Sequence, residues 1–195
     1  MKHRIAKSIS YISDPLFLAT PIPFLLVLWA SEDVFYSLKW SVFSMMFFAF
    51  IGLFVLYGVK RNVFSDVDVS KREQRPAFYA FAVYVCLLYL GSLLLLDGPP
   101  VLFLAGCGVL LSIVAITIVN LKIKASVHVA TVTALIFIVS ILYGDAFLFF
   151  LLFIPLIIWS RIVTKRHTMQ EAVIGGSVGV ILTLIVYVAI KLLIV

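Results

Sequence analysis

The sequence predicts an all-α fold, a polytopic bundle of transmembrane helices. Of its 195 residues, 64% are hydrophobic and only 12% are charged, whereas a soluble domain is about 45–50% apolar and about 25% charged. The apolar residues gather in runs of roughly 17–25 residues, the length at which a helix crosses the hydrocarbon core of a bilayer. We therefore expect about six or seven spans, within a single transmembrane domain that covers residues 1–195.

The first expected span is short, covers residues 15–30, and contains Pro21 and Pro23. The basic stretch before it resembles the start of a signal peptide, but no small-x-small cleavage site follows, so we predict a retained span. The other expected spans cover residues 40–57, 77–96, 101–119, 126–143, 146–163 and 172–195. The expected connections are residues 31–39, 58–75, 97–100, 120–125, 144–145 and 160–171.

The basic residues predict the topology. Thirteen of the fifteen lysines and arginines lie at the N-terminus or in the connections 58–75, 120–125 and 160–171, and only Lys39 and Lys191 lie on the other side. Positively charged loops stay in the cytoplasm. We therefore expect a cytoplasmic N-terminus and an external C-terminus, in a plasma or inner membrane. The net charge of +6 is then a topology signal and does not predict a nucleic-acid partner.

Several small residues lie inside the expected spans. Cys86 and Cys107 are both in apolar runs, which predicts core residues and neither a disulfide framework nor a zinc site. In the last span, Gly175, Gly176 and Gly179 predict close packing against another helix.

The most informative polar stretch is WSRIVTKRHTMQE, residues 159–171. His167 follows Arg161 by six positions, and Glu171 follows His167 by four. Residues four apart on a helix share a face, so Glu171 is expected to orient the imidazole and favour its protonated form. The guanidinium of Arg161 suits phosphate oxygens. Together these groups favour phosphoryl transfer through a histidine nucleophile.

Two other polar clusters interrupt the apolar chain. The cluster SDVDVSKREQRP, residues 65–76, contains Lys71, Arg72 and Arg75, and the cluster KIKASVH, residues 122–128, contains Ser126 and His128. Two expected spans separate each cluster from the next, so all three are expected on one membrane face, in one pocket. Ser126 is also a good N-cap for the span that follows it, which is compatible with phosphate binding at a helix start.

The three clusters resemble the three-part signature of the type 2 phosphatidic acid phosphatase superfamily, KxxxxxxRP, PSGH and SRxxxxxHxxxD. The third part is present from Ser160 to Glu171 with the family spacing, and Glu171 replaces the aspartate. The second part keeps Ser126 and His128 but has other residues in place of proline and glycine. The first part keeps the Arg-Pro pair at Arg75, with Asp68 in place of the lysine.

The resemblance implies a metal-independent phosphatase, without cofactor, that acts on lipid or isoprenoid phosphates. It implies that His167 attacks phosphorus, that Glu171 supports His167, and that His128 protonates the leaving oxygen and then activates water. It also implies a set of phosphate-binding residues, namely Arg75, Arg161 and Ser126 together with Lys71 or Arg72 in place of the missing lysine.

Three alternatives stay open. Asp66 and Asp68 with the Arg-Pro pair faintly resemble the aspartate-rich loop of intramembrane prenyltransferases, in which magnesium holds a diphosphate. A non-catalytic protein that binds or transports a lipid phosphate would use the same pocket, and a family member with weak or no hydrolase activity would share the same residues. The sequence is compatible with a homo-oligomer surrounded by membrane lipids.

Overall fold

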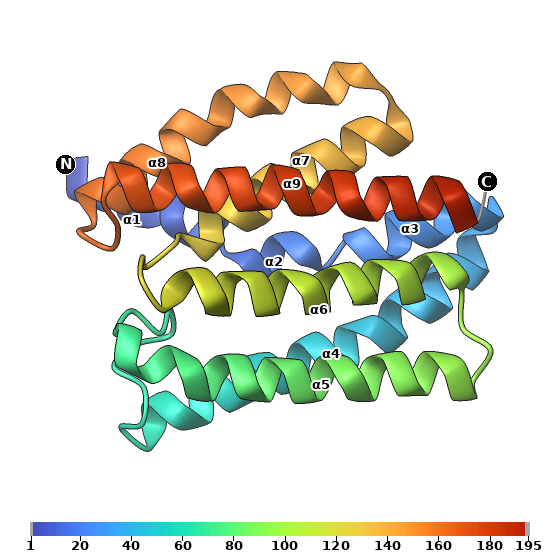
Figure 1. Ribbon diagram of the computed structural model, residues 1–195, viewed down its shortest axis with the longest axis horizontal. Coiled ribbons are helices and arrows are strands. Elements are labelled where there is room, and N and C mark those ends of the chain that lie inside the picture. The colour runs from blue at the N-terminus through green and yellow to red at the C-terminus, as the bar shows by residue number, and fades with distance from the viewer. Residues whose placement is uncertain (1, 194–195) are drawn as a thin grey trace. The chain divides into compact units, whose positions relative to one another are not determined.

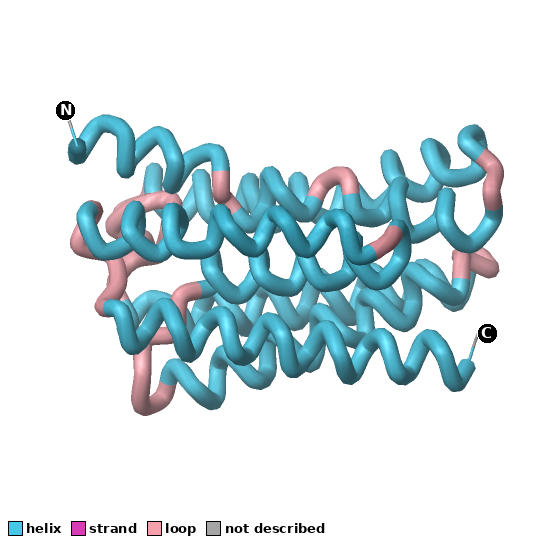
Figure 2. Tube along the Cα trace, turned by 90° about the horizontal axis from the view of Figure 1, so that it is seen from above, coloured by secondary structure: helices cyan, strands magenta, loops and turns pink. Residues whose placement is uncertain are grey.

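The computed structural model describes residues 2–193, and every regular element in that part of the chain is a helix. Figure 2 shows these helices and the loops that join them. The all-α prediction is confirmed. Five helical segments are long and apolar enough to cross a membrane, and a sixth span results if the helices of residues 2–19 and 22–31 are counted as one. With α7, Val127–Tyr143, a shorter apolar helix of 17 residues, each of the seven expected apolar runs is mostly helical over its described residues, and residues 194–195 of the last run lie outside them.

The chain divides into two compact units. The first unit comprises the described parts of Met1–Ala19 and Ile118–Val195, and the second comprises Thr20–Thr117. Figure 1 labels the α-helices of both. The first unit contains α1 Lys2–Ile12, α2 Pro15–Ala19, α7, the 3₁₀ helix η2 Asp145–Phe153, α8 Ile154–Val163 and α9 Met169–Leu193. The second contains α3 Ile22–Ser31, α4 Val34–Lys60, the 3₁₀ helix η1 Arg72–Gln74, α5 Arg75–Leu95 and most of α6 Pro100–Asn120.

The expected connection at residues 31–39 is wrong. Only Glu32 and Asp33 separate α3 from α4. A carboxylate oxygen of Asp33 accepts a hydrogen bond from the backbone N–H of Tyr36 (3.0 Å), so Asp33 is the N-cap of α4. Lys39, expected in a loop, therefore lies inside α4.

Two prolines explain other differences from the expected spans. The span expected at residues 15–30 divides into α2 and α3, because Pro21 starts a new helix as the N-cap of α3. The span expected at residues 146–163 is a 3₁₀ helix followed by α8, and Pro155 lies in the first turn of α8. Proline has no backbone N–H, so it is tolerated at a helix start, where that N–H would have no partner within the helix.

The core of the first unit joins its helices around α7. Val129 and Val132 of α7 pack with Ile157 of α8 and Ala172 of α9. Ile9 of α1 packs against the same cluster. This core fixes the positions of the polar segments that precede α7 and α9.

Candidate functional site

Glycines hold α9 against α7 at backbone distance. A Cβ atom on Gly175 would collide with the carbonyl oxygen of Ser126, and a Cβ atom on Gly179 would collide with that of Ala130. The second contact lies one turn further along both helices than the first, so α7 and α9 run parallel (Figure 1). Helices in membranes approach this closely where glycine is repeated at every fourth position. The close packing expected from these glycines is therefore confirmed.

Two hydrogen bonds extend this contact along the helices. At its start, the N–H of Ser126 donates to the carbonyl oxygen of Glu171 (3.0 Å). Further along, the hydroxyl of Thr183 donates to the carbonyl oxygen of Ala134 (3.4 Å). The starts of α7 and α9 are therefore tied together by main-chain atoms, which depend little on side-chain rotamers.

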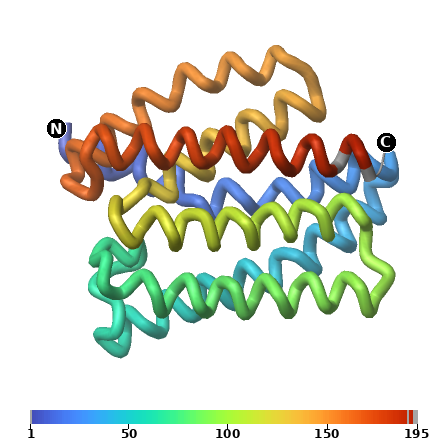
Figure 3. The backbone as a smooth tube through the Cα atoms, in the orientation of Figure 1, coloured from blue at the N-terminus to red at the C-terminus, as the bar shows by residue number. Residues whose placement is uncertain are grey.

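This packing brings the second and third polar clusters to the same end of the first unit. His128 lies in the first turn of α7, and His167 lies two residues before α9. Between them the chain leaves along α7 and returns through η2 and α8, as Figure 3 shows. Both histidine side chains are largely buried.

The ring of His167 has a defined tautomer. Its Nδ1 lies 3.2 Å from a carboxylate oxygen of Glu171 and 3.1 Å from the carbonyl oxygen of Lys124. Because the carbonyl oxygen of Lys124 can only accept a hydrogen bond, Nδ1 carries the proton. The lone pair of the neutral ring is then on Nε2, the atom that a nucleophilic role requires.

Glu171 meets His167 for a different reason than the one we expected. His167 lies outside α9, so the two residues are not one turn apart on a helix. Instead, Thr168 and Glu171 form a capping box: the carboxylate accepts from the N–H of Thr168 (3.0 Å), and the Thr168 hydroxyl accepts from the N–H of Glu171 (3.3 Å). The same carboxylate oxygen thus caps α9 and binds the imidazole.

Arg161 is buried near the end of α8, with 2% of its surface exposed. Its Nη1 donates to the hydroxyl of Ser10 in α1. Its carbonyl oxygen accepts from the N–H groups of Arg166 (3.0 Å) and His167 (3.2 Å), which closes the turn before α9. Lys124 Nζ donates to the carbonyl oxygen of Arg166 (2.9 Å) and so ties this turn to the connection before α7.

Ser126 is the N-cap of α7. Its hydroxyl accepts from the N–H of Val129 (3.5 Å), and the residue is fully buried. The N-terminal end of a helix carries a partial positive charge that favours anions. Ser126, His128 and the start of α7 therefore form a polar segment suited to binding an anion.

The first polar cluster lies in the second unit, so the roles of Arg75, Arg72 and Lys71 stay predictions. Arg75 is buried at the start of α5, where its Nε donates to the carbonyl oxygen of Val69 (3.3 Å). Lys71 is exposed, and Arg72 is partly buried.

Asp66, which we considered as a magnesium ligand, is used within its own loop. One of its carboxylate oxygens accepts from the N–H of Asp68 (3.0 Å) and from the hydroxyl of Ser70 (2.8 Å). Nearby, the Gln74 side-chain oxygen accepts from both the N–H and the hydroxyl of Ser65. These bonds give Asp66 a structural role in shaping the loop.

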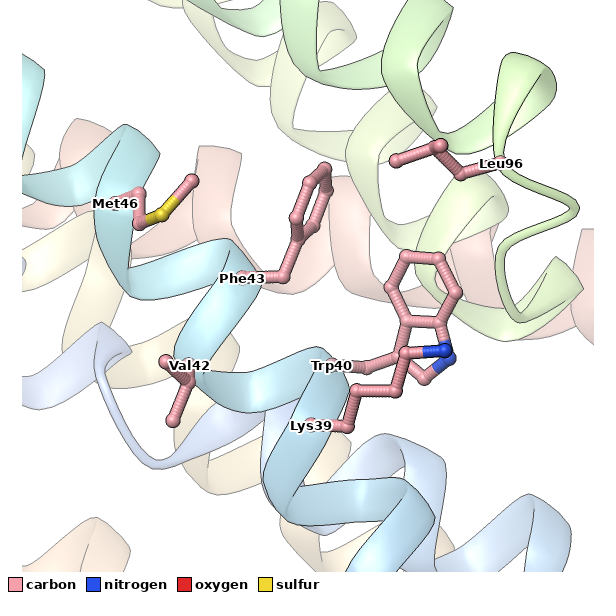
Figure 4. Close-up of a pocket in the computed structure, with 6 residues that line it drawn as sticks. All are labelled: Lys39, Trp40, Val42, Phe43, Met46 and Leu96. Atoms are coloured by element: carbon pink, nitrogen blue, oxygen red, sulfur yellow. The ribbon is translucent and has the colours of Figure 1, made fainter.

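A separate hollow of about 380 Å³ lies in the second unit beside α4. Figure 4 shows the side chains that line it, which are Lys39, Trp40, Val42, Phe43, Met46 and Leu96. The amine of Lys39 lies 5.2 Å from the centre of the Trp40 ring. A tryptophan beside a lysine is typical of the membrane interface. The lining contains neither histidine nor carboxylate, so the hollow does not offer the chemistry predicted for the polar clusters.

Three contributing residues were not selected from the sequence. Thr168 had a readable signal, because Thr-x-x-Glu before an apolar run predicts a capping box. The contributions of Lys124 and Ser10 depend on contacts across 43 and 151 positions of the chain, which no local pattern encodes.

Comparison of the chain with known protein families, with curated proteins and with solved structures found no match. The likeness to the phosphatase superfamily therefore rests on the three polar clusters alone.

Proposed function

We propose that this integral membrane protein is a phosphatase of lipid-linked phosphates, such as phosphatidic acid, phosphatidylglycerol phosphate or an isoprenyl phosphate. Nε2 of His167 attacks phosphorus, the bond from phosphorus to the lipid oxygen breaks, and His128 gives that oxygen its proton. Water then attacks the phosphohistidine while His128 takes a proton from it. The phosphorus–nitrogen bond breaks, and inorganic phosphate leaves.

The observation that carries this proposal is the environment of His167. Two acceptors on Nδ1 direct the lone pair to Nε2, and the carboxylate of Glu171 stabilises the positive charge that the ring acquires when Nε2 is phosphorylated. Phosphoryl transfer depends on positioning and charge stabilisation. The buried cation of Arg161 is tied to the same turn through its own carbonyl oxygen, which supports a role in binding phosphate.

A substrate panel in detergent tests the proposal. Phosphate release from the three substrate classes is measured for the wild type, His167→Ala and His128→Ala. We expect His167→Ala to lower kcat at least about 1000-fold, because no other nucleophile replaces it. We expect His128→Ala to accumulate a phosphoenzyme that is labile in acid and stable in base. Full activity of His167→Ala would refute the histidine mechanism.

The same assay separates the alternatives. Activity that is lost with EDTA and restored by magnesium would favour the prenyltransferase-like enzyme. Tight binding of a phosphorylated lipid without phosphate release would favour a binding or transport protein, or a family member without hydrolase activity.

We further propose that the N-terminus and the site face the cytoplasm, in a plasma or inner membrane. The excess of basic residues at the N-terminus and around Arg161 supports this orientation. A single cysteine placed at Ser8, in a variant with Cys86 and Cys107 replaced by serine, should be protected from an impermeant thiol reagent in sealed cells and labelled after lysis. Labelling in sealed cells would reverse the orientation.

A further inference from the structure

The N-terminal helix α1 packs on α8 and reaches Arg161, the buried cation of that helix. Ala6 of α1 is fully buried, and Ile9 joins the core that Ile157 of α8 also contacts. One residue further along, the hydroxyl of Ser10 accepts a hydrogen bond from Nη1 of Arg161. A residue near the N-terminus thus holds a side chain that lies 151 positions away in the sequence.

This contact matters because Arg161 is almost fully buried and permanently charged. A guanidinium has five N–H donors in a fixed plane, so an acceptor on one nitrogen limits the directions of the others. A hydroxyl provides that acceptor without adding negative charge. The sequence of α1, KHRIAKSISYI, contains no carboxylate, and its exposed Lys2, Arg4 and Lys7 are all basic.

We propose that Ser10 is a positioning residue, which orients the guanidinium of Arg161 for a phosphate group. This inference rests on the proposed function, because it assigns to Arg161 the phosphate of the same site. Ser10 does not touch the phosphate. It acts through Arg161, and α1 thereby becomes part of the binding apparatus.

The test uses three variants of the 195-residue chain in detergent. Ser10→Ala removes the acceptor, Ser10→Thr keeps a hydroxyl, and Ser8→Ala is the matched control, because Ser8 is an exposed serine on the same helix. Binding of inorganic phosphate is measured by calorimetry, and kcat and KM are measured with phosphatidic acid.

We expect Ser10→Ala to weaken phosphate binding and raise KM about tenfold, with kcat within about twofold of the wild type. The loss of a hydrogen bond to a charged group weakens binding by about this factor of ten. An interaction made equally in the ground state and the transition state affects KM alone. Ser10→Thr should recover most of the affinity, and Ser8→Ala should equal the wild type.

Two results would overturn the inference. One is unchanged phosphate binding in Ser10→Ala, whether or not its melting temperature and kcat fall, and the other is no phosphate binding by the wild type. Failure of the proposed function looks different. If His167→Ala and the wild type both release no phosphate, but phosphate binding still depends on Ser10, the positioning role stands and the hydrolase mechanism falls.

Discussion

The polar segments of the two units are built differently. In the first unit, the segments before α7 and α9 are joined to distant parts of the chain, as in the bonds from Lys124 to Arg166 and from Arg161 to Ser10. In the second unit, the loop after α4 contains bonds between near neighbours, as in the contacts of Ser65 with Gln74 and of Asp66 with Ser70. The segment with strict motif spacing is thus the one assembled by long-range contacts. The segment in which Asp68 replaces the motif lysine contains bonds between residues that are close in sequence.

The strongest test of this difference replaces one buried arginine from each unit with lysine. Arg161→Lys should lower kcat/KM about 100-fold, because an ammonium cannot contact the Ser10 hydroxyl and also present a planar pair of donors to phosphate. Arg75→Lys should lower kcat/KM about tenfold or less, since part of the Arg75 side chain is engaged by the carbonyl oxygen of Val69.

Steady-state kinetics of both variants on phosphatidic acid check this expectation, with circular dichroism to verify folding. An equal loss in the two variants would mean that the start of α5 contributes as much to phosphate binding as α8 does. The two units would then differ in how their polar segments are held together, but not in how much their arginines contribute to activity.

The second test weakens the contact between α7 and α9, which places the segments that contain His128 and His167 at the same end of the first unit. Gly179→Ala puts a methyl group against the carbonyl oxygen of Ala130, so α9 must move away from α7. We expect a loss of about 1–3 kcal/mol in the free energy of unfolding, typical of overpacking. Gly91→Ala in α5 is the matched control, because a Cβ atom there meets nothing within 4 Å. It should be neutral or slightly stabilising.

Unfolding of both variants is followed by intrinsic fluorescence during titration of mixed micelles with dodecyl sulfate. Equal stability of Gly179→Ala and the wild type would show that the parallel contact of α7 and α9 tolerates separation. It could not then be what fixes His128 and His167 at one end of the first unit.

The fold was largely predictable because hydrophobic run length reports directly on spanning helices. The positions at which the helices start were less predictable. Residues after Asp33 carry polar side chains at Ser37 and Lys39, so hydropathy alone suggested a loop, whereas the capping carboxylate begins α4 at Val34. Hydropathy measures partition into lipid, but a helix start is decided by which group satisfies the first backbone N–H donors.

The candidate site was predictable only where it is local in sequence. The spacing of His167 and Glu171 predicted their contact, although the capping box brings them together and not a shared helical face. The partners Ser10 and Lys124 depend on how α1 and the start of α7 pack, which the order of residues along the chain does not encode.

The smallest effect is expected for a substitution that separates the two roles of Glu171, which are the cap of α9 and the contact with His167. Glu171→Gln keeps an oxygen that can accept from the N–H of Thr168, so the cap of α9 and the stability should be preserved. It removes the negative charge beside His167. The Lys124 carbonyl still accepts from Nδ1, so the tautomer is retained and only the stabilisation of the charged ring is lost. We expect kcat to fall about tenfold.

The matched variant is Thr168→Ala, which removes the other half of the capping box and leaves the carboxylate. It should lower the free energy of unfolding by about 1 kcal/mol, with kcat within about twofold of the wild type. Thermal unfolding and kcat are measured on both proteins. If Glu171→Gln loses stability but keeps its kcat, the carboxylate serves only α9. The contact with His167 would then be a by-product of the cap. Another group would have to stabilise the positive charge of the phosphorylated ring.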